Sequence, residues 1–165
     1  MVASNTDYKK TTIVFPFKDD QALLGMKKRG FGQGWWNGFG GKLEADEGYE
    51  ESARRETTEE VGIEVGELVH IADLLFYFDD SLEIVSRAYR TDFTGEPIET
   101  DEMKPQYFSP DKLPYDIMWP GDDQWIPKVL AADAILPIGF IVHFDKNKTF
   151  KSIETVPVSQ IENWF

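Results

Sequence analysis

The stretch GGKLEADEGYEESARRETTEEVGI, residues 40–63, decides the fold that we expect for this chain. Its central part, Glu50–Val61, has the composition of a helix, and Gly62 follows as a residue suited to end one. With about 100° per residue, one stripe of this helix holds four residues at a spacing of four: Tyr49, Ala53, Thr57 and Val61. This stripe is the candidate buried face, so we expect the helix to pack on a sheet through it.

Three glutamates lie beside this stripe. Glu60 projects into the stripe itself, Glu56 lies at its edge, and Glu59 lies a little beyond. A solvated acidic face is the usual explanation for such a helix, but here like charges at i and i+4 repel, anions near a helix C-terminus oppose the macrodipole, and partial burial costs solvation. A divalent cation reverses these effects, because hard Mg²⁺ prefers carboxylate oxygens and keeps waters and phosphates in its other positions. The helix therefore indicates a Mg²⁺ site.

The overall charge restricts what the protein binds. The chain has 17 Lys and Arg against 30 Asp and Glu, a net charge of -13, and such a field repels polymeric nucleic acid and anionic membranes. A small phosphate-bearing ligand can still bind if metal ions bridge it to carboxylates and local cations help, and the candidates are Lys27, Lys28, Arg29 and Lys42. Cysteine is absent, which excludes a disulfide framework, a thiolate nucleophile and a cysteine-based zinc site.

The length and the N-terminus indicate a soluble protein of one domain. We expect the 165 residues to form a single domain over residues 1–165. The N-terminus, MVASNTDYKK, lacks an apolar run of signal-peptide length, and no segment approaches the ~20 apolar residues of a membrane span. We therefore expect a cytoplasmic monomer whose partner is a small molecule.

The rest of the chain alternates apolar runs with turn residues, which predicts strands. They are expected at residues 11–17, 22–28, 68–78, 83–93 and 106–110, and in a final hairpin over 135–158 that turns at Asp145–Lys148. Pro16 indicates that the first strand is an edge strand or ends there, and Gln124–Asp133 is expected to form a short helix. Strands mixed with two helices predict the α/β or α+β class, with helices packed on a sheet.

The opening stretch also resembles a known family motif. Gly41, five residues, Glu47, seven residues and then RETTEEVGI are similar to the Nudix box, Gly-x5-Glu-x7-Arg-Glu-U-x-Glu-Glu-x-Gly-U, in which U is aliphatic. Thr57 is the one departure, because the family usually has Ile, Leu or Val there; its hydroxyl is expected to weaken helix packing and to leave the metal ligands untouched. The resemblance implies a Nudix-type α/β/α sandwich, with a mixed β-sheet on which the box helix packs.

Segments outside the box narrow this resemblance. The runs LLGMKKRGFGQGWWNGFGGK (23–42), DEMKP (101–105) and DIMWPGDDQWIP (116–127) are similar to the MutT-homologue branch, which hydrolyses oxidised purine nucleoside triphosphates such as 8-oxo-dGTP. The resemblance covers about residues 12–127. It implies an enzyme of nucleotide-pool sanitation that uses Mg²⁺, or Mn²⁺ in its place, and releases a nucleoside monophosphate and pyrophosphate.

Carried over by position, the resemblance implies the metal ligands. They are the carbonyl of Gly40 and the carboxylates of Glu56, Glu59, Glu60 and Glu102. One of these four glutamates is implied to be the general base that activates the attacking water, and the sequence leaves open which one. Residues of the box with a structural role are implied to be Gly41, Glu47, Arg55 and Gly62, with Arg55 pairing with Glu47. The chemistry needs positioned metal ions and no covalent nucleophile.

The resemblance also implies the residues around the nucleotide. Trp119 would stack on the purine near Phe31 and Phe76, and Asn37 offers both a donor and an acceptor to the base. The other nucleotide-binding residues implied are Thr12, Lys27, Phe39, Gly40, Gly41 and Lys42. Structural positions are expected for His70, His143, Trp35, Trp36 and Trp125, with Trp36 also a candidate for the pocket wall.

At one segment the chain departs from the family pattern. Trp-Pro-Asp-Asp is expected, but residues 119–123 read WPGDD, so Gly121 replaces the first acid and Asp122 matches the second. A local shift would instead present Asp122 and Asp123 as the pair. Two adjacent acids discriminate bases because one can donate while protonated and the other can accept, so the preference for oxidised purines depends on this segment.

Two other functions stay open at this point. A different Nudix substrate, such as a normal dNTP or another nucleoside diphosphate linked to a moiety X, would keep the chemistry and change the base contacts. A non-catalytic nucleotide-sensing or interaction module would use the same fold. The complete set of acidic box positions favours an enzyme over such a module.

Overall fold

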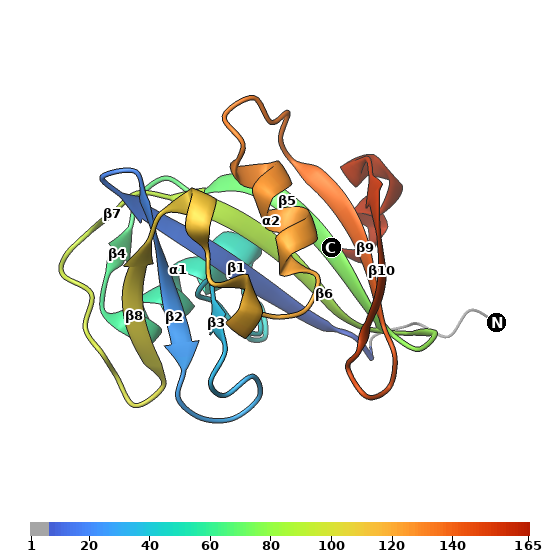
Figure 1. Ribbon diagram of the computed structural model, residues 1–165, viewed down its shortest axis with the longest axis horizontal. Coiled ribbons are helices and arrows are strands. Elements are labelled where there is room, and N and C mark those ends of the chain that lie inside the picture. The colour runs from blue at the N-terminus through green and yellow to red at the C-terminus, as the bar shows by residue number, and fades with distance from the viewer. Residues whose placement is uncertain (1–6) are drawn as a thin grey trace.

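A mixed β-sheet of eight strands runs through the molecule between two α-helices (Figure 1). The computed structural model describes residues 7–165. The strands are β1 (Lys9–Lys18), β2 (Gln21–Lys27), β3 (Trp36–Asn37), β4 (Glu64–Val65), β5 (Val69–Phe78), β6 (Ser81–Thr91), β7 (Phe93–Thr94), β8 (Met103–Phe108), β9 (Ile138–Phe144) and β10 (Phe150–Val156). The helices are α1 (Tyr49–Val61) and α2 (Asp122–Leu130), and the 3₁₀ turns are η1 (Pro110–Lys112), η2 (Tyr115–Ile117), η3 (Val158–Gln160) and η4 (Glu162–Trp164).

The strands pair in the order β10-β9-β5-β6-β1-β2-β3, and β8 pairs with β2. β1 runs parallel to β6, with Thr12 opposite Arg87, and β5 runs parallel to β9. The predicted hairpins of β1 with β2, β5 with β6, and β9 with β10 are all antiparallel pairs. The mixed sheet confirms the predicted fold class. β4 and β7 form a separate two-stranded sheet.

Neighbouring residues of β1 face different helices. Val14 packs in a buried cluster with Ala53 of α1, whereas Phe15 packs in another cluster with Trp125 and Ile126 of α2. Because successive side chains of a strand point to opposite faces of its sheet, α1 and α2 cover opposite faces, as Figure 1 shows. This arrangement confirms the predicted α/β/α sandwich.

The predicted buried stripe of α1 is confirmed. Ala53, Thr57 and Val61 are fully buried, and Tyr49 is partly buried against the same layer. The Thr57 hydroxyl donates to the carbonyl of Ala53 at 2.7 Å, so this buried group has a partner within its own helix. Gly62 ends the helix in the left-handed conformation, at φ +73°.

The expectation for Pro16 is wrong. β1 continues through Pro16 to Lys18, and it lies between β6 and β2 rather than at an edge. The N–H groups of Thr12 and Val14 donate away from β6, to the segment after β3. By alternation, the nitrogen of Pro16 also faces away from β6, so no hydrogen bond of the parallel pair is lost.

The second helix begins and ends earlier than predicted, at Asp122–Leu130 instead of Gln124–Asp133. Gly121 precedes it, and the two aspartates occupy its first turn, where carboxylates complement the helix dipole. Ala131 is already extended, which ends the helix. Neither this helix nor any other in residues 7–165 is long and apolar enough to cross a membrane.

We expect the substitution Thr57→Val to change the free energy of unfolding by less than about 1 kcal/mol. Valine keeps the buried shape, and the carbonyl of Ala53 keeps its backbone partner in the helix. The control Thr57→Ala leaves a small cavity and should cost about 1 kcal/mol or more. Urea denaturation measures both, and a loss above about 2 kcal/mol for Thr57→Val would show that the hydroxyl has a larger structural role.

Candidate active site

A cavity of about 250 Å³ lies between the sheet and the start of α2. Its walls come from β1, β2, β5, β6 and β9, from the loop between β2 and β3, and from residues 119 and 122. Polar groups around Glu60 and aromatic rings around Trp119 share this cavity. The fold therefore brings the box helix and the predicted base-binding segment to one place.

Glu60 connects α1 to the cavity. Its Oε1 accepts a hydrogen bond from the N–H of Gly40 at 2.8 Å, and the residue is only 4% exposed. Burial raises the pKa of Glu60 to about 8, although the hydrogen bond from Gly40 acts in the opposite direction. The carboxylates of Glu56 and Glu102 raise this pKa further. An approaching cation would favour the ionised form of such a buried acid.

Two glycines allow the backbone to approach α1 closely. Gly40 has φ +145°, and a Cβ there would overlap the carbonyl of Thr12. A Cβ at Gly41 would lie 2.7 Å from the carboxyl carbon of Glu56. A side chain is therefore excluded at Gly40, whereas one at Gly41 would have to displace the carboxylate of Glu56. The backbone of this segment lies next to the carboxylates of the helix.

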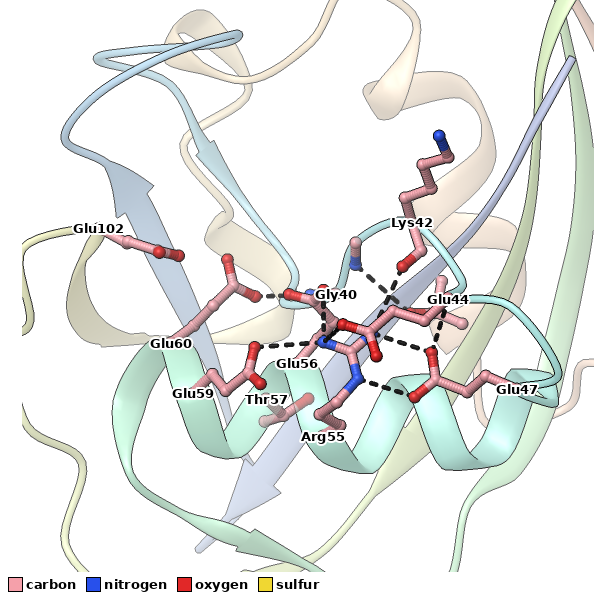
Figure 2. Close-up of polar contacts among 12 residues, drawn as sticks. Gly40, Lys42, Glu44, Glu47, Arg55, Glu56, Thr57, Glu59, Glu60 and Glu102 are labelled. Atoms are coloured by element: carbon pink, nitrogen blue, oxygen red, sulfur yellow. Dashed lines mark hydrogen bonds and ion pairs between the residues drawn. The ribbon is translucent and has the colours of Figure 1, made fainter.

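Arg55 donates hydrogen bonds to the other carboxylates of the box (Figure 2). Its Nε and Nη2 donate to Glu47 at 2.7 and 2.9 Å, which is the expected pairing. Its Nη1 donates to Glu56 at 3.0 Å and to Glu59 at 3.2 Å. The hydrogen bond from Arg55 lowers the pKa of Glu47 to about 2. One guanidinium thus balances several negative charges.

The expected convergence of three glutamates of α1 is not found in this arrangement. Within residues 7–165, no three His, Asp or Glu side chains are grouped so that they could hold one metal ion. The reason is electrostatic, because Arg55 holds Glu56 and Glu59. Glu60 instead turns to the N–H of Gly40. Glu102 reaches toward Glu60 from the segment before β8 (Figure 2).

Aromatic rings form much of the cavity wall. The ring centroid of Trp119 lies 5.0 Å from that of Phe31 and 4.9 Å from that of Trp35. Phe144 meets Trp119 edge-on at 6.4 Å, and Phe76 also lines the cavity. Such a wall can stack against a purine.

Two polar side chains of the cavity have hydrogen-bonding capacity left for a ligand. Asn37 Oδ1 accepts from the N–H of Gly38 at 2.8 Å, which leaves its amide NH₂ to donate. Asp122 is 6% exposed, and its Oδ1 accepts from Nε1 of Trp125 at 2.9 Å. Its Oδ2 is buried and has no hydrogen-bond partner among the described residues. Burial raises the pKa of Asp122 to about 7.

Most of the predicted nucleotide-binding residues line this cavity. They are Thr12, Lys27, Phe31, Asn37, Gly40, Gly41, Phe76, Trp119 and Asp122. The structure places three others elsewhere. Phe39 is fully buried in the cluster that contains Val61 and Met103, and Lys42 lines a separate hollow beside the start of β1.

Asp123 is the third residue outside the cavity. It is exposed, whereas Asp122 is buried in the cavity wall. Adjacent residues of a helix point about 100° apart. Of the two, Asp122 lines the cavity in this arrangement and Asp123 does not, and the alternative that they form the acid pair stays a prediction.

Sequence reasoning missed several cavity residues. Trp35 lines the cavity, whereas Trp36 packs in the core. Phe78, Ser86 and Phe144 also line it. The signal for Phe78 was its spacing of two from Phe76, which places both on one face of β5. The two histidines pack within the structure: His70 lies 2.7 Å from Asp73 Oδ1, and His143 stacks on Tyr77.

Known proteins that resemble this chain belong to one family or share its fold. Residues 7–129 match the NUDIX domain family. The chain is 46% identical over 130 residues to the oxidized purine nucleoside triphosphate hydrolase of Danio rerio, covering 78% of this chain and 83% of the relative. It is 42% identical over 121 residues to the Mus musculus protein of the same name, covering 72% and 78%. A crystal structure of a MutT protein from Bacillus halodurans has a TM-score of 0.77 at 25% identity, covering 90% of this chain and 98% of that chain.

The α/β/α sandwich, the cavity beside its carboxylate-rich helix and these relatives together define a hydrolase. The chain belongs to the NUDIX domain family. Enzymes of this family generally need a divalent metal ion.

The raised pKa of Asp122 predicts a pH dependence of stability. An unfolded Asp has a pKa near 4, whereas the pKa of folded Asp122 is about 7. Between these pH values the folded state keeps a proton that the unfolded state has lost. The contribution is complete below about pH 4 and is lost as the pH rises, by at most about 1.4 kcal/mol per pH unit.

We therefore expect Asp122→Asn to reduce the fall in melting temperature between pH 4 and pH 7, measured by thermal unfolding. The exposed neighbour supplies the control Asp123→Asn, which should alter the profile much less, because the charge of Asp123 is a smaller cause of the raised pKa of Asp122 than burial. Glu60 contributes in the same direction, so part of the fall persists. An unaltered profile in Asp122→Asn would contradict the assignment.

Proposed function

We propose that this protein is a Mg²⁺-dependent pyrophosphohydrolase of oxidised purine nucleoside triphosphates, of the 8-oxo-dGTP and 2-oxo-dATP type. Its products are a nucleoside monophosphate and pyrophosphate, and its role is to remove damaged nucleotides from the precursor pool. We further propose that it acts in the cytoplasm as a monomer. Its partner is then the small nucleotide substrate alone.

One observation carries this proposal. The same cavity contains Glu60 and Gly40 of the metal-binding candidates and Trp119 and Asp122 of the base-binding candidates. Glu60 and Gly40 suit a metal-bound triphosphate, and Trp119 and Asp122 suit a purine, so the cavity suits a whole nucleotide. The names of the Danio rerio and Mus musculus relatives support the same substrate class.

The residues at this site suit a hard divalent cation. The available donors are oxygens, from the carbonyl of Gly40 and the carboxylates of Glu56, Glu59, Glu60 and Glu102. A cation would relieve both the repulsion between the carboxylates and the burial of Glu60. When bound, it would acidify a coordinated water and stabilise charge on the phosphoryl oxygens.

The side chains of the protein position the substrate phosphates and accept the proton of the attacking water. Lys27 lines the cavity and acts electrostatically on Glu60, so its ammonium can also neutralise phosphate oxygens. The Glu59 side chain is 56% exposed, so it can leave Arg55 and turn inward with little obstruction. One of the four glutamates then takes the proton of the attacking water.

A second substrate class keeps the same chemistry. Normal dNTPs, or a nucleoside diphosphate linked to another group, are favoured by the presence of Gly121 where the resemblance predicts an acid. A non-catalytic nucleotide sensor would bind its ligand in the same cavity but would not turn it over. The hydrolysis assay distinguishes the second substrate class, and the double substitution distinguishes the non-catalytic sensor.

The first experiment is a Mg²⁺-dependent hydrolysis assay with normal dNTPs, 8-oxo-dGTP and 2-oxo-dATP. We expect an oxidised purine to have the highest kcat/KM and to release pyrophosphate rather than phosphate. Equal turnover of normal and oxidised nucleotides would instead support the second substrate class.

The double substitution Glu59→Gln/Glu60→Gln separates an enzyme from a sensor. In an enzyme it should reduce kcat by at least about 100-fold, because both oxygen donors lose their negative charge. Binding of the product monophosphate, measured by calorimetry without metal, should change little. Glu51→Gln, on the exposed side of α1, is the control. Wild-type turnover in the double variant would contradict the proposed site.

Metal binding should also release a proton near pH 7. The pKa of Glu60 is about 8, so its carboxyl holds a proton that a cation displaces. Calorimetric titration with Mg²⁺ or Mn²⁺ in two buffers of different ionisation enthalpy measures this release. Glu60→Gln should remove it and Glu51→Gln should not; an equal release in both variants would assign the proton to another group.

A further inference from the structure

The loop between β7 and β8, residues 95–102, holds the C-terminal end of α1. The last carbonyls of a helix have no partner inside the helix itself. Here the N–H of Ile98 donates to the carbonyl of Val61 at 2.9 Å, and the hydroxyl of Thr100 donates to the carbonyl of Glu60 at 2.8 Å. The loop is therefore tied to the backbone of the residue whose carboxyl lies in the cavity wall.

The same hydroxyl also holds the segment that carries Glu102. Thr100 Oγ1 accepts from the N–H of Glu102 at 3.2 Å and from the N–H of Met103 at 3.3 Å. The N–H of Thr100 in turn donates to the carbonyl of Met103 at 3.0 Å, which closes a tight bend. One side-chain oxygen thus connects the backbone of Glu60 to the backbone of Glu102, although the two residues lie far apart in the sequence.

The bend is held from a second side by Lys28, the residue after β2. Its N–H donates to the carbonyl of Glu102 at 2.9 Å, and its Nζ donates to the carbonyl of Thr100 at 2.9 Å and to Glu99 at 2.7 Å. β2 also pairs with β8, the strand that follows the bend. The backbone of Glu102 therefore has a position that both the sheet and α1 determine.

The carboxyl of Glu102, by contrast, is held weakly. Its side chain is 50% exposed, and Nη2 of the exposed Arg29 lies 3.5 Å from its Oε1. An exposed ion pair at this distance contributes little. The carboxyl nevertheless points toward Glu60 (Figure 2), and its charge raises the pKa of Glu60. Since two carboxylates repel each other, the backbone of the bend is what keeps them together.

We propose that Thr100 is a positioning residue of the cation site: its hydroxyl holds Glu102 beside Glu60, so that α1 and the loop before β8 bind one divalent cation together. The proposal rests on the cation site of the proposed function and is independent of the nucleotide and of turnover. Thr100 is not itself a ligand, because its one proton and both of its lone pairs are already used in three hydrogen bonds.

The hydroxyl affects metal affinity through the order of the site before the cation arrives. A bend without these hydrogen bonds lets Glu102 move away from Glu60, so that cation binding must also order the loop, at a cost in conformational entropy. Removing a group that orients metal ligands through hydrogen bonds typically reduces metal affinity by about 10–100-fold. We expect an effect of this size for Thr100.

The test measures Mn²⁺ binding to the protein without nucleotide, by counting free Mn²⁺ from its electron paramagnetic resonance signal. Thr100→Val keeps the shape of the side chain and loses the three hydrogen bonds, so the Kd should rise at least about tenfold. Thr100→Ser restores the hydroxyl and should bind Mn²⁺ within about threefold of the wild-type protein. Wild-type affinity in Thr100→Val would overturn the proposal, as would an equal loss of affinity in Thr100→Ser.

Thr58 supplies a matched control at the same end of α1. Its hydroxyl donates to the carbonyl of Ile63 at 2.9 Å, so it stabilises the helix end without holding Glu102. Thr58→Val should lower the melting temperature and leave the Kd for Mn²⁺ unchanged. If Thr58→Val weakened Mn²⁺ binding as much as Thr100→Val, the hydroxyl of Thr100 would act through helix stability alone, and the proposal would fail.

A double-mutant cycle tests whether Thr100 acts through Glu102. Glu102→Gln should itself raise the Kd for Mn²⁺. Adding Thr100→Val to Glu102→Gln should then change the Kd by less than about twofold, because the positioned carboxylate is already gone. Two independent losses that multiply in the double variant would contradict the proposed route.

A further variant keeps the test decisive if Thr100→Val does not fold. Glu102→Asp shortens the side chain by one methylene, and a fixed bend cannot move to restore its reach, so Mn²⁺ affinity should fall about as far as in Glu102→Gln. Wild-type affinity in Glu102→Asp would overturn the proposal. The expected Mn²⁺ binding without nucleotide hydrolysis would reject the proposed function and leave this inference standing. Hydrolysis of oxidised purine nucleotides with unaltered Mn²⁺ binding in Thr100→Val would do the reverse.

Discussion

The hydrogen bond from the N–H of Gly40 to the buried carboxyl of Glu60 joins the box helix to the sheet, and the site is arranged around it. It requires a backbone that comes close to the helix, and at Gly40 this backbone leaves no room for a side chain. It also places an acid where burial opposes ionisation. A low-dielectric position of this kind strengthens the attraction between the carboxyl and a cation.

Charge balance explains how a chain with net charge -13 accommodates a polyphosphate. Arg55 is the internal counter-ion of the box, and it bonds to Glu47, Glu56 and Glu59 at once. Its bidentate contact with Glu47 has the geometry of a strong, oriented pair. Its longer contact with the exposed Glu59 is the weaker one. The same guanidinium can therefore stay anchored on one carboxylate while it releases another to a metal ion.

The sequence predicted the local features well, because they depend on neighbours along the chain. The stripe of α1, its end at Gly62 and the pairing of Arg55 with Glu47 all follow from spacing within one motif. The prediction from Pro16 was wrong, because which strands pair with each edge of β1 is decided by the tertiary fold and not by the local sequence. Phe39 misled for a similar reason, since its alternation with the glycines does not reveal which layer its ring enters.

The cavity could be predicted only in part, because it is assembled by strand register. Phe76, Phe78 and Phe144 meet there only because β5 runs parallel to β9 with Phe78 opposite Phe144. The sequence near Trp119 does not predict the pairing of β5 with β9. The space at position 121 is harder still to foresee, because its occupant, Phe150, comes from a different hairpin.

The hairpin of β9 and β10 contributes to the cavity, although it lies outside the part of the chain that matches the family. The family match ends at residue 129, and β9 and β10 lie beyond it. Phe144 nevertheless lines the cavity, and the ring of Phe150 lies beside Gly121. The cavity is therefore assembled both from the segment that matches the family and from strands beyond it, so its shape depends on the register of β9 against β5.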